Sequence, residues 1–166
     1  MKKVHVGDEG CTQFFQRYVP KYAEPLELLG ELDELVATLC LASSYLHSAG
    51  LDELVEVLER EVSRLSKVMS YVAGYGSKPV DETVVRELEK MIDDMWRELG
   101  TDFGFTYPTR CLEASLLNLA RTVCRRVERR AAKLLHQGVL DRDTYRYLNR
   151  LSDLLFVAML HAMKRR

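Results

Sequence analysis

Apolar residues recur every three or four positions over most of this chain, which is the spacing of amphipathic α-helices. Five such runs are present, over residues 25–47, 52–74, 81–99, 112–136 and 141–166. Glycines follow several of the runs, and Asp81 and Asp141 stand where an N-terminal cap is expected. Because the connections are short, successive helices should run antiparallel. The pattern predicts an all-α fold, a five-helix antiparallel bundle.

The last run differs from the others because it is apolar nearly all round in "LLFVAMLHAM". Such a segment should be surrounded by other elements of the chain or lie at a subunit interface. The polar stretch "YLNRLSD" comes just before it. It places Asn149 and Asp153 four residues apart, on one face of the helix. Polar groups at the edge of a buried segment need partners.

The chain of 166 residues fits a single domain over 1–166, with an N-terminal segment 1–24 ahead of the bundle at 25–166. Its net charge of −1 argues against a general nucleic-acid binder, which is usually basic. There is no apolar run of about 18 residues, so no membrane span is expected. The start, "MKKVHVGDEG", has no apolar core typical of a secretory signal. We therefore expect a cytoplasmic protein.

Metal-binding patterns are weak. The four cysteines are far apart, and the four histidines show no ligand spacing. Zinc and di-iron sites are therefore not indicated, and buried free thiols are the default interpretation of the cysteines.

A concentration of positive charge is the strongest candidate for chemistry. The stretch "ARTVCRRVERR", Ala120 to Arg130, holds five arginines and one glutamate in the fourth helical run. At about 100° per residue, Arg121, Arg125, Glu128 and Arg129 share one stripe. A solvated polar face is the ordinary interpretation of such a run. Here, however, few acidic residues on the same helix balance the arginines, so like charges repel at i,i+4.

Other helices supply polar groups that could face this stripe. Asp33 and Glu34 lie in "GELDELV", and Asn149 and Asp153 in "YLNRLSD". Guanidinium groups held in place by carboxylates match the oxygens of phosphates in pairs. The stripe therefore predicts a polyphosphate site.

The N-terminal segment offers a second anion-binding pattern. In "VGDEGCT", Val6 to Thr12, two glycines flank an aspartate, and a hydroxyl follows. Such a turn can point backbone N–H groups at an anion, although most Gly-Asp turns are only turns. Arg17 and Lys21 follow closely and add charge, or are simply exposed surface cations.

The motifs "VGDEGCT", "GELDEL", "ARTVCRRVERR" and "YLNRLSDLLFV" occur in the order and approximate spacing of the PduO-type ATP:cob(I)alamin adenosyltransferases. The chain resembles this family over almost its whole length. The resemblance implies a ferritin-like, cobalamin adenosyltransferase-like bundle that assembles as a homotrimer. ATP would bind between neighbouring subunits, under a flexible N-terminal segment.

The activity that the resemblance implies is transfer of the 5′-deoxyadenosyl group of ATP to the cobalt of a reduced corrinoid, cob(I)alamin, with release of triphosphate. Cob(I)alamin is itself the nucleophile, so the protein would position the reactants and stabilise the leaving group. ATP, Mg²⁺ and cobalamin are the implied ligands. A reductase or a corrinoid-dependent enzyme is a candidate partner.

The resemblance also assigns roles to residues. The nucleotide loop is implied for the N-terminal segment, in Gly7, Asp8, Gly10, Thr12, Arg17 and Lys21. Catalysis is implied for Arg125, together with an Asp33–Arg121 pair. The remaining nucleotide contacts are implied for Arg126, Glu128, Arg129 and Asn149, with Glu128 also a candidate Mg²⁺ ligand. Phe105 aligns with an aromatic residue that packs at the lower face of the corrin.

The nucleotide loop also departs from the family pattern. His5, Val6 and Cys11 replace an arginine and two threonines, and Phe15–Gln16 replaces a pair of glycines. This favours one alternative, a homologue that binds nucleotide or corrinoid without adenosyl transfer. A second alternative is a helical module whose arginines bind an acidic partner or RNA. The near-neutral net charge counts against it.

Overall fold

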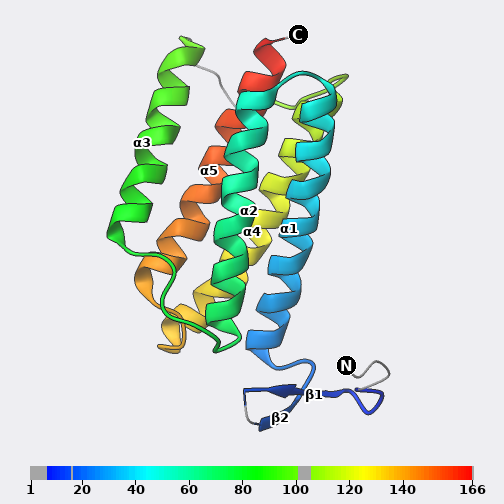
Figure 1. Ribbon diagram of the computed structural model, residues 1–166, viewed down its shortest axis with the longest axis vertical. Coiled ribbons are helices and arrows are strands. Elements are labelled where there is room, and N and C mark those ends of the chain that lie inside the picture. Colours follow the sequence, from blue (N-terminus) through cyan, green and yellow to red (C-terminus); the bar gives the residue numbers. More distant parts are fainter. Residues whose placement is uncertain (1–6, 16, 101–105, 166) are drawn as a thin grey trace.

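Five long helices run alongside one another in the computed structural model, which describes residues 7–15, 17–100 and 106–165 (Figure 1). They are α1 (Glu24–Ser48), α2 (Asp52–Val72), α3 (Glu82–Leu99), α4 (Leu112–His136) and α5 (Arg142–Lys164). Consecutive helices run in opposite directions. The predicted all-α bundle is therefore confirmed, with each helix beginning and ending close to its predicted position.

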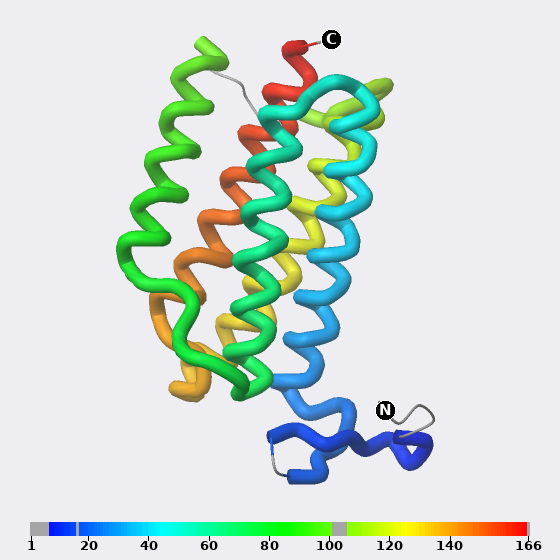
Figure 2. The backbone as a smooth tube through the Cα atoms, viewed as in Figure 1, coloured from blue at the N-terminus to red at the C-terminus, as the bar shows by residue number. Residues whose placement is uncertain are grey.

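The helices pack in the spatial order α2, α1, α4, α5, α3. The helix α3 lies at the outer edge and packs mainly on α5, as the backbone trace shows (Figure 2). The other four helices enclose the core. The lower end, in the view of Figure 1, holds the start of α1 and the end of α4.

Local caps fix two of the helix starts. The side chain of Asp81 accepts a hydrogen bond from the backbone N–H of Val84, and that of Asp141 accepts from Asp143 and Thr144. Gly100 ends α3 in the left-handed conformation, with φ of 68°. These are the capping positions that the sequence predicts.

The apolar segment of α5 is buried within a single chain. Leu154, Leu155, Ala158, Met159 and Leu160 have no exposed surface. The helix contacts α4 on one side and α3 on the other. Of the two interpretations of its all-round apolarity, burial inside one subunit is therefore the one the structure supports.

Ahead of the bundle, the chain forms a β-hairpin that the sequence pattern did not predict. Strand β1 (Cys11–Phe14) pairs antiparallel with β2 (Arg17–Pro20), and Thr12 lies opposite Val19. The hairpin lies beyond the lower end of the bundle (Figure 1). The ring of Phe15 packs directly on Gly74 and leaves no room there for a Cβ.

Three expectations about the whole chain can be compared with the described residues. No helix in that part of the chain has both the length and the apolarity needed to cross a membrane. All four cysteines are free, as expected. Only Cys111 and Cys124 are buried, however, while Cys11 is half-buried and Cys40 is exposed.

Candidate functional site

A charged stripe along α4 faces polar residues of α5, and it contains most of the predicted catalytic groups. Its position is marked by the buried thiol of Cys124, on the core side of the stripe. Burial raises the pKa of this thiol far above its usual range. The negative charges of Glu128 and Asp153 raise it further, while Arg125 opposes them. These three charged groups therefore surround Cys124 at the α4–α5 boundary.

Arg121 forms the upper end of this stripe. Its Nε and Nη2 atoms donate hydrogen bonds to Oδ1 of Asn118, at 3.0 and 2.9 Å. Burial lowers the pKa of this guanidinium, and the neighbouring charge of Arg125 lowers it further. Two cations held this close together make a site that favours an anion.

The lower end of the stripe is Glu128, which is held from α5. The hydroxyl of Tyr145 donates a hydrogen bond to its Oε1 atom at 3.0 Å. Tyr145 stands one helical turn before Asn149. Since α4 and α5 are antiparallel, this contact puts Asn149 level with Cys124 and Arg125. At this register, Arg121, Arg125 and Glu128 of α4 and Asn149 of α5 lie within about two helical turns of one another along the α4–α5 boundary.

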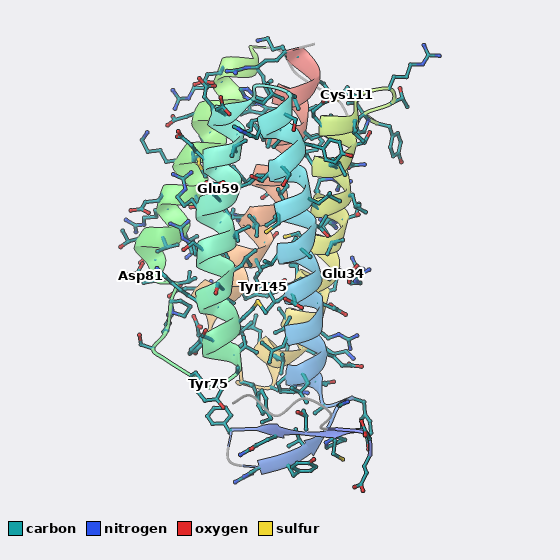
Figure 3. All side chains as sticks on the ribbon, turned by 45° about the vertical axis from the view of Figure 1, so that its right-hand side comes forward. Glu34, Glu59, Tyr75, Asp81, Cys111 and Tyr145 are labelled. Atoms are coloured by element: carbon teal, nitrogen blue, oxygen red, sulfur yellow. The ribbon has the colours of Figure 1, made fainter. Side chains whose placement is uncertain are left out.

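A second set of cations on α4 faces α1 instead. Arg126 forms an ion pair with Glu34, and Arg130 forms ion pairs with Glu27 at 2.6 Å and Glu31 at 3.2 Å. Figure 3 shows Glu34 on the side of α1 that turns toward α4. A shallow cavity of about 300 Å³ opens here, lined by Glu31, Arg126, Arg129, Arg130 and Lys133. Arg126 therefore lies on the α1 side of α4, about 100° around the helix from Arg125, while Arg129 follows Arg125 by one turn and lies between the two groups.

The predicted Asp33–Arg121 pair is not brought together within one chain. The Glu34–Arg126 ion pair fixes the level of α1 against α4. At that register, Arg121 is level with Thr38 and Leu39, about 9 Å along the helix from Asp33. The carboxyl group of Asp33 is exposed. The acidic residues of α1 that orient arginines inside the chain are instead Glu27, Glu31 and Glu34.

The nucleotide loop predicted from the sequence forms a turn at the side of the β-hairpin. Gly10 N–H donates to the carbonyl of Gly7 at 3.2 Å, and Lys21 N–H donates to that of Gly10 at 2.8 Å. Gly7 has a φ of +91°, and a Cβ there would lie 2.9 Å from Nζ of Lys21. Only glycine suits this position. The ammonium group of Lys21 thus lies beside the turn.

The remaining predicted residues of this segment are more open. Asp8 and Arg17 are exposed, and Thr12 is half-buried in β1. The segment lies at the lower end of the bundle, whereas Arg125 is about 16 Å up α4 from its end at His136. One chain therefore presents two separate groups of predicted site residues. Phe105, His5 and Val6 fall outside the described residues.

A resident metal centre is not apparent in the described residues, where no group of three or more His, Cys, Asp or Glu side chains could hold an ion. Glu128 is a single carboxylate within the stripe. That donor set fits a Mg²⁺ ion bound mainly by phosphate oxygens and water, because such ions take few protein ligands.

Comparison with known proteins points to one family. The family model for cobalamin adenosyltransferases matches residues 3–162. Corrinoid adenosyltransferase MMAB of Mus musculus is 33% identical over 169 residues, covering 95% of this chain and 71% of the relative. The corrinoid adenosyltransferase of Bacillus subtilis is 32% identical, covering 92% and 81%. PduO of Salmonella typhimurium is 31% identical, and the chain spans about half of its length.

Solved structures extend the match to the fold. A variant of the PduO-type ATP:corrinoid adenosyltransferase from Lactobacillus reuteri, complexed with cobalamin and ATP, superposes with a TM-score of 0.86 at 27% identity. The match covers 95% of this chain and 90% of that one. A second variant of the same protein, complexed with ATP, gives a TM-score of 0.84.

Proposed function

Because the chain belongs to the cobalamin adenosyltransferase family, we propose that it transfers the 5′-deoxyadenosyl group of ATP to the cobalt of a reduced corrinoid. The observation that carries this proposal is the stripe of Arg121, Arg125 and Glu128 on α4, with Asn149 level with it on α5. This stripe places cations that can bind a phosphate chain beside a carboxylate that can bind its metal ion. The bundle that carries the stripe is shared with a known adenosyltransferase.

The chemistry asks for charge stabilisation rather than a protein nucleophile. In the transfer, two electrons of Co(I) form the bond from cobalt to C5′ of ATP. The C5′–O bond breaks, and its electron pair leaves with the triphosphate. Arg125 is exposed beside Arg121, so it can meet the growing negative charge of that leaving group. Lys21 supplies a second cation, beside the Gly7 turn.

Glu128 and Asn149 are assigned to binding and orientation. Glu128 is the residue that would hold Mg²⁺, which when bound neutralises part of the charge on the triphosphate. Asn149 lies level with Arg125 on the facing helix and offers an amide for hydrogen bonding to the nucleotide. Arg126 and Arg129 line the neighbouring cavity and add to its positive potential. For Phe105 we propose the lower face of the corrin.

We further propose that the complete site forms between subunits of a homotrimer. Two arguments support a second copy on the α1–α4 face. Leu41 and Tyr45 of α1 and Leu112 and Leu119 of α4 are each 44–51% exposed. The register of α1 on α4 places Leu41 beside Leu119, so these residues form an exposed apolar strip.

The second argument is geometric. Suppose that α1 of one copy meets α4 of another in the antiparallel sense, with Asp33 against Arg121. Arg125 of the second copy then lies level with Leu29 and Gly30 of the first. Glu128 follows one turn lower, toward the hairpin that precedes α1. Such a contact joins the two groups of site residues that one chain keeps apart.

Gly30 fits this arrangement. It is exposed on α1, one turn from Asp33, and a Cβ there would meet nothing within 4 Å in its own chain. A glycine inside a helix costs about 1 kcal/mol relative to alanine. A close approach by a neighbouring copy or by the nucleotide explains why glycine stands here despite this cost.

The test is anaerobic spectrophotometry of cob(I)alamin mixed with ATP and Mg²⁺. We expect the cob(I)alamin spectrum to give way to that of adenosylcobalamin, with one triphosphate released per corrinoid consumed. Binding of ATP without triphosphate release would instead select the homologue that does not transfer the adenosyl group. Sedimentation of the same sample tests the trimer.

A further inference from the structure

The hydroxyl of Tyr145 is a feature of the site that none of the sequence motifs contains. The motif "YLNRLSD" begins two residues later, at Tyr147. Tyr145 lies one turn before Asn149 on the same side of α5, and its side chain is half-buried against the core. Figure 3 shows it near the middle of the view, between the helices. Its hydroxyl group points to α4, where it meets Glu128.

We propose that Tyr145 is a positioning residue that fixes the carboxylate of Glu128 for the nucleotide and its metal ion. This inference rests on the proposed function of the stripe. The 3.0 Å hydrogen bond from Tyr145 occupies Oε1 of Glu128. No other described side chain donates a hydrogen bond to this carboxylate, so Oε2 remains available for a ligand.

The contact restrains an otherwise flexible side chain. Glutamate has three rotatable side-chain bonds, and ordering them costs free energy. A tyrosine ring packed against the core has fewer such motions, so its hydroxyl is a better fixed point. A carboxylate held by that point keeps its position relative to Arg125, one turn away on the same helix face.

The electrostatics of the pair agree with a shared hydrogen bond. Burial raises the pKa of Tyr145, and the hydrogen bond to Glu128 and its negative charge raise it further. The phenol therefore keeps its proton at neutral pH and acts as the donor, while the carboxylate of Glu128 accepts.

The chain offers a matched control two residues away. Tyr147 also lies on α5, and its hydroxyl donates to a carboxylate at 2.9 Å. Its acceptor is Glu61, which is fully buried in the core and belongs to α2 rather than to α4. Tyr145→Phe and Tyr147→Phe thus remove the same atom from the same helix. One removal affects the candidate site, and the other affects only the core.

The experiment measures the dissociation constant of ATP by calorimetry in the presence of Mg²⁺ and without corrinoid. We expect Tyr145→Phe to weaken binding about tenfold, as for the loss of one hydrogen bond to a charged group. Its thermal midpoint should stay at the wild-type value. Tyr147→Phe should show the reverse, with a lower midpoint and unchanged ATP affinity.

A double variant tests whether Tyr145 acts through Glu128. If it does, Tyr145→Phe should add nothing to the loss already caused by Glu128→Gln. Wild-type ATP affinity in Tyr145→Phe, or losses that simply multiply, would overturn the inference.

The proposed function is tested separately in the same proteins. If Tyr145→Phe transfers the adenosyl group normally and binds ATP with unaltered affinity, Tyr145 has no positioning role and the proposed function stands. If the wild-type protein binds ATP through the Tyr145–Glu128 pair but does not transfer the adenosyl group, the role of Tyr145 stands and the proposed function is wrong. Absence of ATP binding by the wild-type protein removes both.

Discussion

The hydroxyl of Tyr147 lies 2.9 Å from Oε2 of Glu61, and both side chains are completely buried where α2 meets α5. The same carboxylate accepts a hydrogen bond from Nη1 of Arg64 at 3.0 Å. Burying a charge is costly unless it is paired and hydrogen-bonded, and here both carboxylate oxygens have partners. This contact ties α2 to α5 through the core.

We expect Glu61→Ala to lower the free energy of unfolding by about 3 kcal/mol, since it leaves Arg64 and the Tyr147 hydroxyl without their buried partner. Urea denaturation measures the loss. Glu59→Ala, at an exposed position two residues earlier on α2 (Figure 3), is the control and should have little effect. Equal stability of the two variants would show that the buried carboxylate contributes nothing.

At the candidate site, Arg125→Ala should abolish most of the activity while leaving the fold intact. Arg125 is exposed, so its removal opens no cavity in the core. A donor aimed at developing charge is worth about 100-fold or more in rate. Turnover is measured by the cob(I)alamin assay and folding by the thermal midpoint. Arg86→Ala, at an exposed position on α3, is the control. Near-normal turnover in Arg125→Ala would remove this residue from the site.

Much of this architecture could be predicted from the sequence, because the helices carry their own signals. Asp81 and Gly100 mark the two ends of α3, and apolar spacing defines the buried faces. The β-hairpin lacked such a signal. Its strands have four residues each, and the contact of Phe15 with Gly74 joins positions far apart in the chain.

Part of the site could likewise be predicted from the sequence, because the residues of one helix face follow from helical spacing. The stripe of Arg121, Arg125 and Glu128 follows from helical geometry alone. The Tyr145–Glu128 contact depends on the register of α5 against α4, which packing of the whole bundle decides. Likewise, only the register of α1 shows that Arg126 meets Glu34 within the chain and that Arg121 does not meet Asp33 there.

The assignment of Asp33 to a contact between copies gives a further prediction. Asp33→Asn and Arg121→Ala should each weaken the trimer, and their effects should not add if the two residues form one pair. Sedimentation at several protein concentrations measures the assembly. Glu34→Gln is the control, because this neighbouring carboxylate is paired within its own chain. It should leave the oligomeric state unchanged. Additive effects of the first two variants would argue against the pair.

Gly30 gives a test that separates folding from function. Gly30→Ala should raise the free energy of unfolding by up to about 1 kcal/mol, since alanine favours helix and has room in its own chain. The same Cβ should reduce adenosyl transfer, because the proposed neighbouring Arg125 and nucleotide approach here. Ser44→Ala, farther along the exposed side of α1, should leave transfer unchanged. Full activity in Gly30→Ala would show that nothing approaches this position closely.

The start of α5 gives a prediction about pH. Burial alone would raise the pKa of Asp141, but hydrogen bonds from Thr144 and from Lys78 outweigh it and hold the pKa below its usual value. A carboxyl group whose pKa is lower in the folded state stabilises the fold above its unfolded pKa. That contribution is lost as the pH falls through the folded value.

We therefore expect Asp141→Asn to be less stable than the wild type at pH 7, with the difference shrinking below about pH 4 as Asp141 takes up a proton. Asparagine is also a good helix cap, so the substitution mainly removes the charge that faces Lys78. Urea denaturation at a series of pH values measures the difference. Asp93→Asn, at an exposed position on α3, should show no such trend. A stability difference that stayed constant down to pH 3 would mean that the cap acts by geometry alone, because protonation of Asp141 would then cost the fold nothing.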